Sequence, residues 1–132
     1  MIGLDTNVLV RCFVNDDPSQ AERAARFIAS QCSRDNPGFV NRVTLCEMVW
    51  VLARAYGYKG AEIARVVSDL LDSTDIVIED HELVRTALKP FERGTTGFAD
   101  ALIGMVNRAR GCDATATFDR RAARLDEFVA VP

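Results

Sequence analysis

Four acidic side chains stand just after predicted strands or early in the helices that follow them. They are Asp5, Glu47, Asp100 and Asp119. Mg²⁺ and Mn²⁺ prefer carboxylate oxygens, and carboxylates gathered without a cation repel one another and take up protons. Two such ions about 4 Å apart can hold a phosphodiester, because one activates water and the other steadies the leaving oxygen. If the four acids converge, the sequence predicts a metal-dependent phosphodiesterase site.

The elements that would carry these acids alternate between short apolar runs and longer amphipathic helices. Strands are predicted at residues 1–4, 39–40, 76–78, 114–117 and 128–131. Helices are predicted over 8–14, from 18, from 44, after 60, around 83–88, from 98 and over 119–125, with a loop from Pro90 to Gly97. This alternation implies βαβ crossovers and a mainly parallel sheet covered by helices on both faces. The predicted fold class is therefore α/β, as one domain over residues 1–132.

A parallel sheet also predicts where its chemistry lies. In open sheets of this kind the functional crevice is found beyond the carboxyl ends of the strands. Asp5 follows the first strand, Glu47 lies in the first turn after the second, and Asp119 follows the fourth. Asp100 stands near the start of its helix. We therefore expect the four acids to lie at one edge of the sheet.

Each acid also has an ordinary structural explanation. Asp5 and Asp119 are good helix N-cap residues, and Asp100 would complement a helix dipole. Thr44 and Glu47 have the spacing of a capping box. Glu47 nevertheless stands within the apolar run LCEMVWVL, where an unpartnered carboxylate would be costly to bury and a cation would remove that cost.

Composition limits the remaining possibilities. The 132 residues are 48% apolar and 27% charged, which is the balance of a soluble globular protein. The start of the chain has no basic and apolar leader, and the four scattered cysteines lack C-x-x-C spacing, so we expect a cytoplasmic protein with reduced thiols and no membrane span. The formal charge of −3 argues against a polyanionic partner.

Four motifs in order resemble those of PIN-domain ribonucleases. They are IGLDTNVLVR at 2–11, LCEMVWVL at 45–52, GFADALI at 97–103 and TATFDRRAARL at 115–125. The segment DDPSQAERA at 16–24 is similar to toxins of the VapC type in toxin–antitoxin pairs. The resemblance runs from the first predicted strand to the last, and it implies a PIN-like three-layer α/β/α sandwich with a sheet of about five strands.

The resemblance further implies an endoribonuclease that binds one or two Mg²⁺ or Mn²⁺ ions through the four acids named above, which match its motifs one by one. It implies that a metal-activated water attacks RNA, that a VapB-like cognate antitoxin silences the enzyme, and that the protein is a homodimer. Thr6, Asn7 and Thr117 would orient the carboxylates or the water, although capping explains them equally well. Two bound Mg²⁺ would change the formal charge from −3 to +1, which weakens the objection to an RNA partner.

Other polar and aromatic residues receive weaker assignments. Arg11, Arg120 and Arg121 lie near the acids in sequence and could contact RNA phosphates, but solvated surface explains them too. His81, at a predicted helix start, is expected to be solvated or capping. The aromatic residues Trp50, Tyr56 and Tyr58 could stack on bases, yet packing in a core or dimer face is favoured for Trp50.

Two rival functions remain open. A PIN-like module could bind RNA or protein without cutting, its acids being structural caps, and Mn²⁺ would then give no stabilisation. A phosphohydrolase with Asp5 as nucleophile would want a second acid close by, but Asn7 stands two residues further on.

Overall fold

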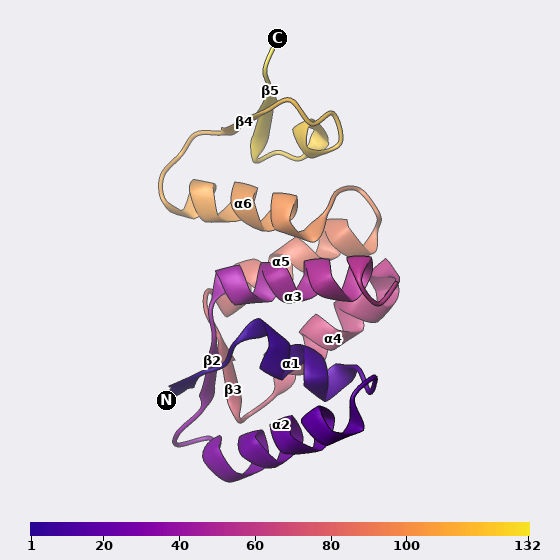
Figure 1. Cartoon of the computed structure of the whole chain (residues 1–132). Coiled ribbons are helices and arrows are strands. Elements are labelled where there is room, and N and C mark those ends of the chain that lie inside the picture. Colours follow the sequence, from indigo (N-terminus) through magenta and orange to yellow (C-terminus); the bar gives the residue numbers. More distant parts are fainter. The chain divides into compact units, whose positions relative to one another are not determined.

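The computed structural model describes the whole chain, Met1–Pro132, which separates into two compact units. The first unit is Met1–His81 and the second is Glu82–Pro132. Figure 1 labels their helices and strands along the sequence. None of the helices is both long and apolar enough to cross a bilayer.

The first unit is built on a three-stranded parallel sheet. Its strands are β1 (Ile2–Gly3), β2 (Gly38–Val40) and β3 (Ile76–Ile78), in the order β1-β2-β3. Ile2 pairs with Gly38, which in turn pairs with Ile76. The ladder continues past the strands, because the Leu4 amide donates to the Phe39 carbonyl (2.9 Å) and the Glu79 amide to the Val40 carbonyl (2.9 Å).

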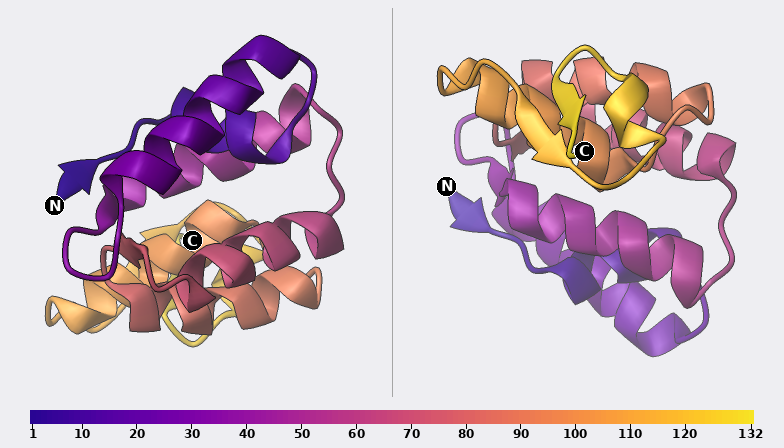
Figure 2. Two further views of the ribbon diagram at one scale, coloured as in Figure 1. Left: turned by 90° about the horizontal axis from the view of Figure 1, so that it is seen from below. Right: turned by 90° about the horizontal axis from the view of Figure 1, so that it is seen from above.

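Four helices accompany this sheet: α1 (Thr6–Phe13), α2 (Pro18–Gln31), α3 (Arg42–Arg54) and α4 (Gly60–Asp72). The side chain of Asp17 caps α2 by accepting from the Gln20 amide, and Pro18 occupies the first turn, where its missing N–H costs nothing. Helices α1 and α2 lie side by side as a hairpin (Figure 2), yet α2 contributes no buried residue.

The core of the first unit comes mainly from α1, α3 and α4. Its fully buried side chains are Leu9, Val40, Leu45, Met48, Leu52, Ile63 and Val67. On α3 the buried positions recur every three or four residues, as a helix with one apolar face requires. Between these buried positions, Glu47 and Trp50 are exposed, and Cys46 and Val51 are half-buried.

The second unit combines two helices with a two-stranded parallel sheet. Its elements are α5 (His81–Glu92), α6 (Phe98–Ala109), β4 (Thr115–Thr117), the 3-10 helix η1 (Ala122–Arg124) and β5 (Phe128–Ala130), with β4 paired to β5. The rings of Phe91 and Phe98 meet edge to face with centroids 5.9 Å apart, at the junction of α5 and α6. A Cβ on Gly104 would overlap the ring of Phe128, so α6 approaches β5 closely.

The α/β class and the parallel pairing predicted from the sequence are confirmed. The five predicted strands are all present, as a sheet of three in the first unit and a sheet of two in the second. Two local predictions are wrong. The helix expected over residues 119–125 is only the single turn of η1, and Pro90 lies inside the last turn of α5 rather than in the following loop.

The close approach at Gly104 predicts the effect of adding one methyl group. Gly104→Ala should lower the free energy of unfolding by about 1 kcal/mol, because crowding against Phe128 and Glu127 outweighs the gain in helix propensity. Urea unfolding monitored by circular dichroism measures this. Gly3→Ala is the matched control, since nothing lies within 4 Å of its added Cβ and its stability should not fall. Equal stability of both variants would contradict the packing of α6 on β5.

Candidate metal and active site

The three strands of the first unit present one polar side chain each at their carboxyl edge. Continuing the observed register past the strands aligns Asp5, Asn41 and Glu79. The Asn41 side chain caps α3 by accepting from the Thr44 amide (2.8 Å). Glu79 accepts from the amide (2.9 Å) and the guanidinium (3.1 Å) of Arg42. These bonds hold the pKa of the Glu79 carboxyl below its ordinary value, and the bond from the Arg42 amide has the largest effect.

Asp5 is the member of this row that forms no such bond. It occupies the N-cap position of α1, but its side chain makes no capping hydrogen bond. The helix begins instead through the backbone, since the Leu9 amide donates to the Asp5 carbonyl (3.2 Å). The capping explanation therefore fails for the exposed Asp5 carboxylate, which is left available for a ligand.

Asp5 shares a pocket with Glu47. This pocket has a volume of about 230 Å³ and is lined by Asp5, Thr6, Asn7, Val10, Arg11, Glu47, Val51 and Tyr56. The two acids come from α3 and from the start of α1, and the two helices pack against each other. Two of the four predicted acids are thus brought together in the first unit.

Two predictions about Glu47 are wrong. Helix α3 begins at Arg42, two residues before the supposed cap at Thr44, and its N-cap is Asn41, so Glu47 lies in the second turn and no Thr44–Glu47 capping box forms. Glu47 is also exposed, because the apolar neighbours that seemed to bury it point to the other face of the helix. Burial cost therefore gives no reason for a cation at Glu47, whereas the shared pocket does.

Thr6 and Asn7 also line the carboxylate pocket. Thr6 is only 6% exposed, and its Oγ1 is buried without a hydrogen-bond partner. A buried hydroxyl without a partner is uncommon, because it loses the water bonds that it makes in the unfolded chain. Beside two carboxylates, such an oxygen suits a site completed by a bound cation and its water.

In the second unit, Asp100 is half-buried in the first turn of α6. One of its carboxylate oxygens would lie 3.6 Å from a Cβ on Gly97, the N-cap residue of the helix. This position near the positive end of α6 fits the helix-dipole explanation. The preceding residue, Thr96, is 2% exposed and likewise has a buried Oγ1 without a partner.

Asp119 does act as a cap. Its Oδ1 accepts from the amides of Arg121 (2.7 Å) and Ala122 (3.0 Å), while the Thr117 Oγ1 accepts from the Asp119 amide (2.9 Å). The bonds from Ala122 and Arg121 hold the pKa of Asp119 below its ordinary value. Arg121 donates to the carbonyls of Gly94 (2.7 Å) and Thr95 (3.4 Å), which ties this turn to the loop before α6. Arg121 thus has a structural role, and Arg120 is exposed.

The convergence of all four acids remains a prediction. Asp5 and Glu47 belong to the first unit, whereas Asp100 and Asp119 belong to the second. No group of three or more His, Cys, Asp or Glu side chains is arranged to hold a metal ion. The residues that fit a cation are therefore the pair of free carboxylates in the first unit, together with the unpartnered Thr6 hydroxyl.

The aromatic residues and the histidine have distinct surroundings. Trp50 is 61% exposed, so packing in a core is the wrong assignment for it. The Tyr58 hydroxyl donates to the Phe13 carbonyl (3.1 Å) and holds the loop after α3 to the end of α1. His81 is exposed at the start of α5, as expected.

The sequence did not reveal how Arg11 is held. Its Nε donates to Gln20 Oε1 (2.7 Å), and its Nη1 donates to Asp16 Oδ1 (2.5 Å) and to the Tyr56 hydroxyl (3.4 Å). Tyr56 in turn donates to Asp16 Oδ2 (2.9 Å). Asp16 and Gln20 come from the DDPSQAERA segment, which the sequence marked only as a resemblance. This network fixes a guanidinium at the rim of the carboxylate pocket.

Comparison with known proteins gives two findings. The model of the PIN domain family matches residues 2–128, a range that includes all four acids. The chain is also 25% identical over 122 residues to a VapC ribonuclease of Aquifex aeolicus (strain VF5), an alignment that covers 92% of this chain and 90% of that protein. No solved structure matches the chain.

Because the Thr6 hydroxyl has no hydrogen-bond partner, removing it should not destabilise the protein. Thr6→Val keeps the shape of the side chain but removes a buried polar atom, so it should leave the free energy of unfolding unchanged or raise it by about 1 kcal/mol. Thermal and urea unfolding without divalent ions measure this. A loss of stability would mean that the hydroxyl is hydrogen-bonded in the folded protein.

The capping bonds of Asp119 predict a pH-dependent stability. A carboxyl whose folded-state pKa is lowered stabilises the fold above its ordinary pKa of 3.8, and that stabilisation is lost as pH falls through the lower folded-state value. Asp119→Ala should therefore be less stable than the native chain at neutral pH, with the difference shrinking below 3.8. Asp119→Asn should stay closer to the native chain at neutral pH because asparagine also caps. A pH-independent difference for the alanine variant would exclude this role for the carboxylate.

Proposed function

Because this chain belongs to the PIN-domain family, we propose that it is a metal-dependent endoribonuclease that acts as the toxin of a toxin–antitoxin pair. The observation that carries the proposal is the Asp5 carboxylate, which stands at a helix start without capping it and shares a pocket with Glu47. The similarity to a VapC ribonuclease supports RNA as the substrate and a cognate VapB-like antitoxin as the partner. A homodimer of single-domain chains belongs to the same proposal.

We propose further that Asp5, Glu47, Asp100 and Asp119 act as one ligand set for one or two Mg²⁺ or Mn²⁺ ions. When bound, such ions supply activation of the attacking water and neutralise charge on the phosphate. The support lies in the chemistry of the donors. Asp5 and Glu47 are exposed, and Asp119 uses only Oδ1 for its two capping bonds. Its other oxygen makes no hydrogen bond within the chain.

The neighbouring polar side chains then have orienting roles. Thr6 and Asn7 line the carboxylate pocket, and in the proposed site their side chains orient Asp5 or the attacking water beside it. Thr117 fixes the backbone of Asp119 through its hydroxyl, and this sets the direction of that carboxylate. The Asp5 or the Glu47 carboxylate can accept a proton from that water as its oxygen bonds to phosphorus and the bond from phosphorus to the leaving ribose oxygen breaks.

Removing single carboxylates tests the assignment. Asp5→Asn and Asp100→Asn should each lower the rate of Mg²⁺-dependent RNA cleavage by about 100-fold or more, because each removes an anionic ligand. The melting temperature of Asp5→Asn should be unchanged or higher, since repulsion between its carboxylate and that of Glu47 is relieved. The measurement is cleavage of total RNA by protein purified without its antitoxin, with Mg²⁺ or with a chelator, followed by sequencing of the new RNA ends.

Asp35→Asn is the matched control, because Asp35 is an exposed acid in the loop before β2 and lines no described pocket. It should cleave like the native chain. Mn²⁺ should stabilise the native chain by about 2.7 kcal/mol at a concentration of about 100 times the dissociation constant, but should not stabilise Asp5→Asn in the same way. Undiminished cleavage by Asp5→Asn would disprove the proposed function. Absence of any Mn²⁺ effect with retained RNA binding would favour a non-catalytic binding module.

A further inference from the structure

A second pocket adjoins the carboxylate pocket in the first unit. It has a volume of about 440 Å³ and lies between α1 and α2, lined by Asn7, Val8, Arg11, Gln20, Arg23, Ala24 and Phe27. Asn7 and Arg11 line both pockets, so the two hollows meet along one face of α1. The volume is within the range of about 300–1,000 Å³ that is usual for small-ligand sites.

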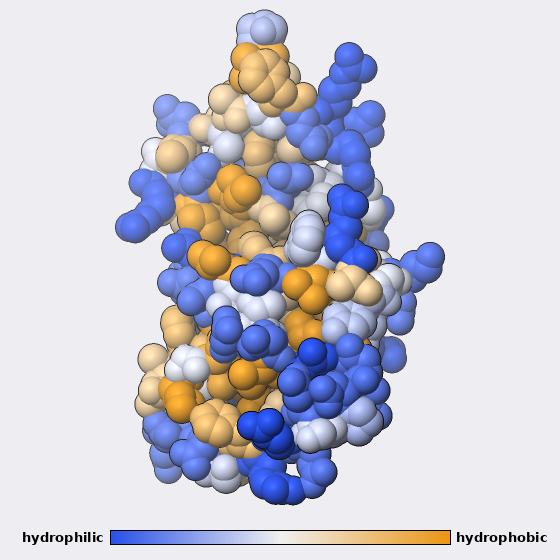
Figure 3. All heavy atoms as spheres, viewed as in Figure 1, coloured by the Kyte–Doolittle hydropathy of each residue, from blue (hydrophilic) through white to orange (hydrophobic).

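The second pocket is lined by a different set of charged residues from the first, and one of them, Arg11, is paired with Asp16. Its lining holds two arginines and no carboxylate, whereas the first pocket holds Asp5 and Glu47. Arg23 is exposed on α2. Figure 3 shows hydrophilic residues gathered over the end of α1 and the start of α2. The arginines of this pocket favour an anionic ligand. Because the pocket lies next to the carboxylate pocket, one polyanionic chain could occupy both.

Arg11 is oriented before any ligand arrives. Gln20, Asp16 and Tyr56 accept from its Nε and Nη1, while its Nη2 makes no hydrogen bond within the chain. Nη2 therefore keeps both of its N–H donors for a ligand. A guanidinium held on one side in this way loses little side-chain entropy on binding a phosphate.

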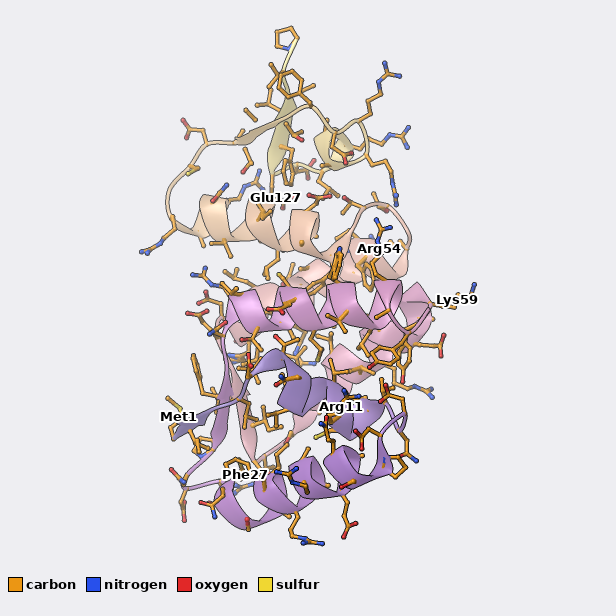
Figure 4. The ribbon with its side chains drawn as sticks, viewed as in Figure 1. Met1, Arg11, Phe27, Arg54, Lys59 and Glu127 are labelled. Atoms are coloured by element: carbon orange, nitrogen blue, oxygen red, sulfur yellow. The ribbon has the colours of Figure 1, made fainter.

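The pocket also offers an aromatic surface. Phe27 of α2 is 42% exposed, and Figure 4 shows it on α2 with Arg11 on α1. Since α2 buries no residue, the core does not account for a phenylalanine at this position. An exposed ring beside cationic side chains is the combination that binds single-stranded nucleic acid, where bases stack and phosphates pair with arginine.

We propose that the pocket between α1 and α2 binds the RNA nucleotide next to the scissile phosphate. Arg11 and Arg23 contact the phosphate of that nucleotide, and Phe27 stacks on its base. The inference rests on the proposed function, which puts the scissile phosphate beside Asp5 and Glu47. The exposed Phe27 ring beside Arg11 and Arg23 favours RNA over a protein segment, because a nucleotide offers both a base to stack and a phosphate to pair.

Two arginines of α2 provide a matched test. Arg23 lines the pocket, whereas Arg26 lies outside it and is paired with Glu22 on the exposed side of the helix. Arg23→Gln and Arg26→Gln remove the same charge from the same helix. The measurement is fluorescence anisotropy of a short labelled single-stranded RNA titrated with the full chain in a chelator, so that nothing is cleaved.

Arg23→Gln should weaken RNA binding by about 5-fold and reduce the slope of log affinity against log salt by about 0.7, the value for one phosphate contact on a single strand. Arg26→Gln should leave both unchanged. Phe27→Ala should weaken binding by about 5-fold or more without changing the salt slope, because stacking is not ionic. With Mg²⁺, Arg23→Gln should raise KM more than it lowers kcat.

Equal RNA affinities for Arg23→Gln and Arg26→Gln would overturn the inference. So would a loss of antitoxin capture by Arg23→Gln with its RNA affinity intact, since the pocket would then be a protein-docking site. The two proposals fail separately. RNA binding measured in a chelator does not depend on cleavage. If Asp5→Asn still cleaved RNA, the proposed function would be disproved, but the RNA-binding measurements on Arg23→Gln would remain valid.

Discussion

The parallel ladder between β1 and β2 is the interaction on which the candidate site depends. It pairs Ile2 with Gly38 and continues through the bond from the Leu4 amide to the Phe39 carbonyl. In that register Asp5 and Asn41 leave the sheet side by side, and each starts a helix. A slip of one residue would reverse the face of every side chain in β1. The shared pocket of Asp5 and Glu47 is thus a consequence of strand pairing.

Asp5 and Asn41 are both N-cap residues, but only Asn41 caps its helix with its side chain. Asparagine caps α3 with its side chain, whereas aspartate starts α1 with its carbonyl alone. An N-cap bond commonly contributes about 1 kcal/mol, so α1 forgoes stabilisation that Asp5 has the chemistry to supply. A residue that could stabilise the fold but does not do so often has a functional role. The Asp5 carboxylate is better explained by a ligand than by the fold.

The sequence predicted the elements well because their signals are local. Apolar runs gave all five strands, and Asp17 with Pro18 marked the start of α2. Glu47 was harder to place, since Thr44 and Glu47 have the spacing of a capping box and the apolar neighbours of Glu47 suggested burial. Helical periodicity settles the matter, because residues on either side of Glu47 turn toward the core and Glu47 itself does not. The order of motifs selects the four acids of the proposed site, but it does not tell which of them also serve as caps.

Capping and metal binding are compatible explanations for a carboxylate, which has two oxygens and about four lone-pair directions. Asp119 gives Oδ1 to the amides of Arg121 and Ala122 and keeps Oδ2. The same bonds lower the pKa of Asp119, so they favour the ionised carboxylate, which is the form that binds a divalent cation. A cap of this kind also fixes the direction of the free oxygen. The structural role of Asp119 is therefore compatible with the cation binding that we propose for its carboxylate.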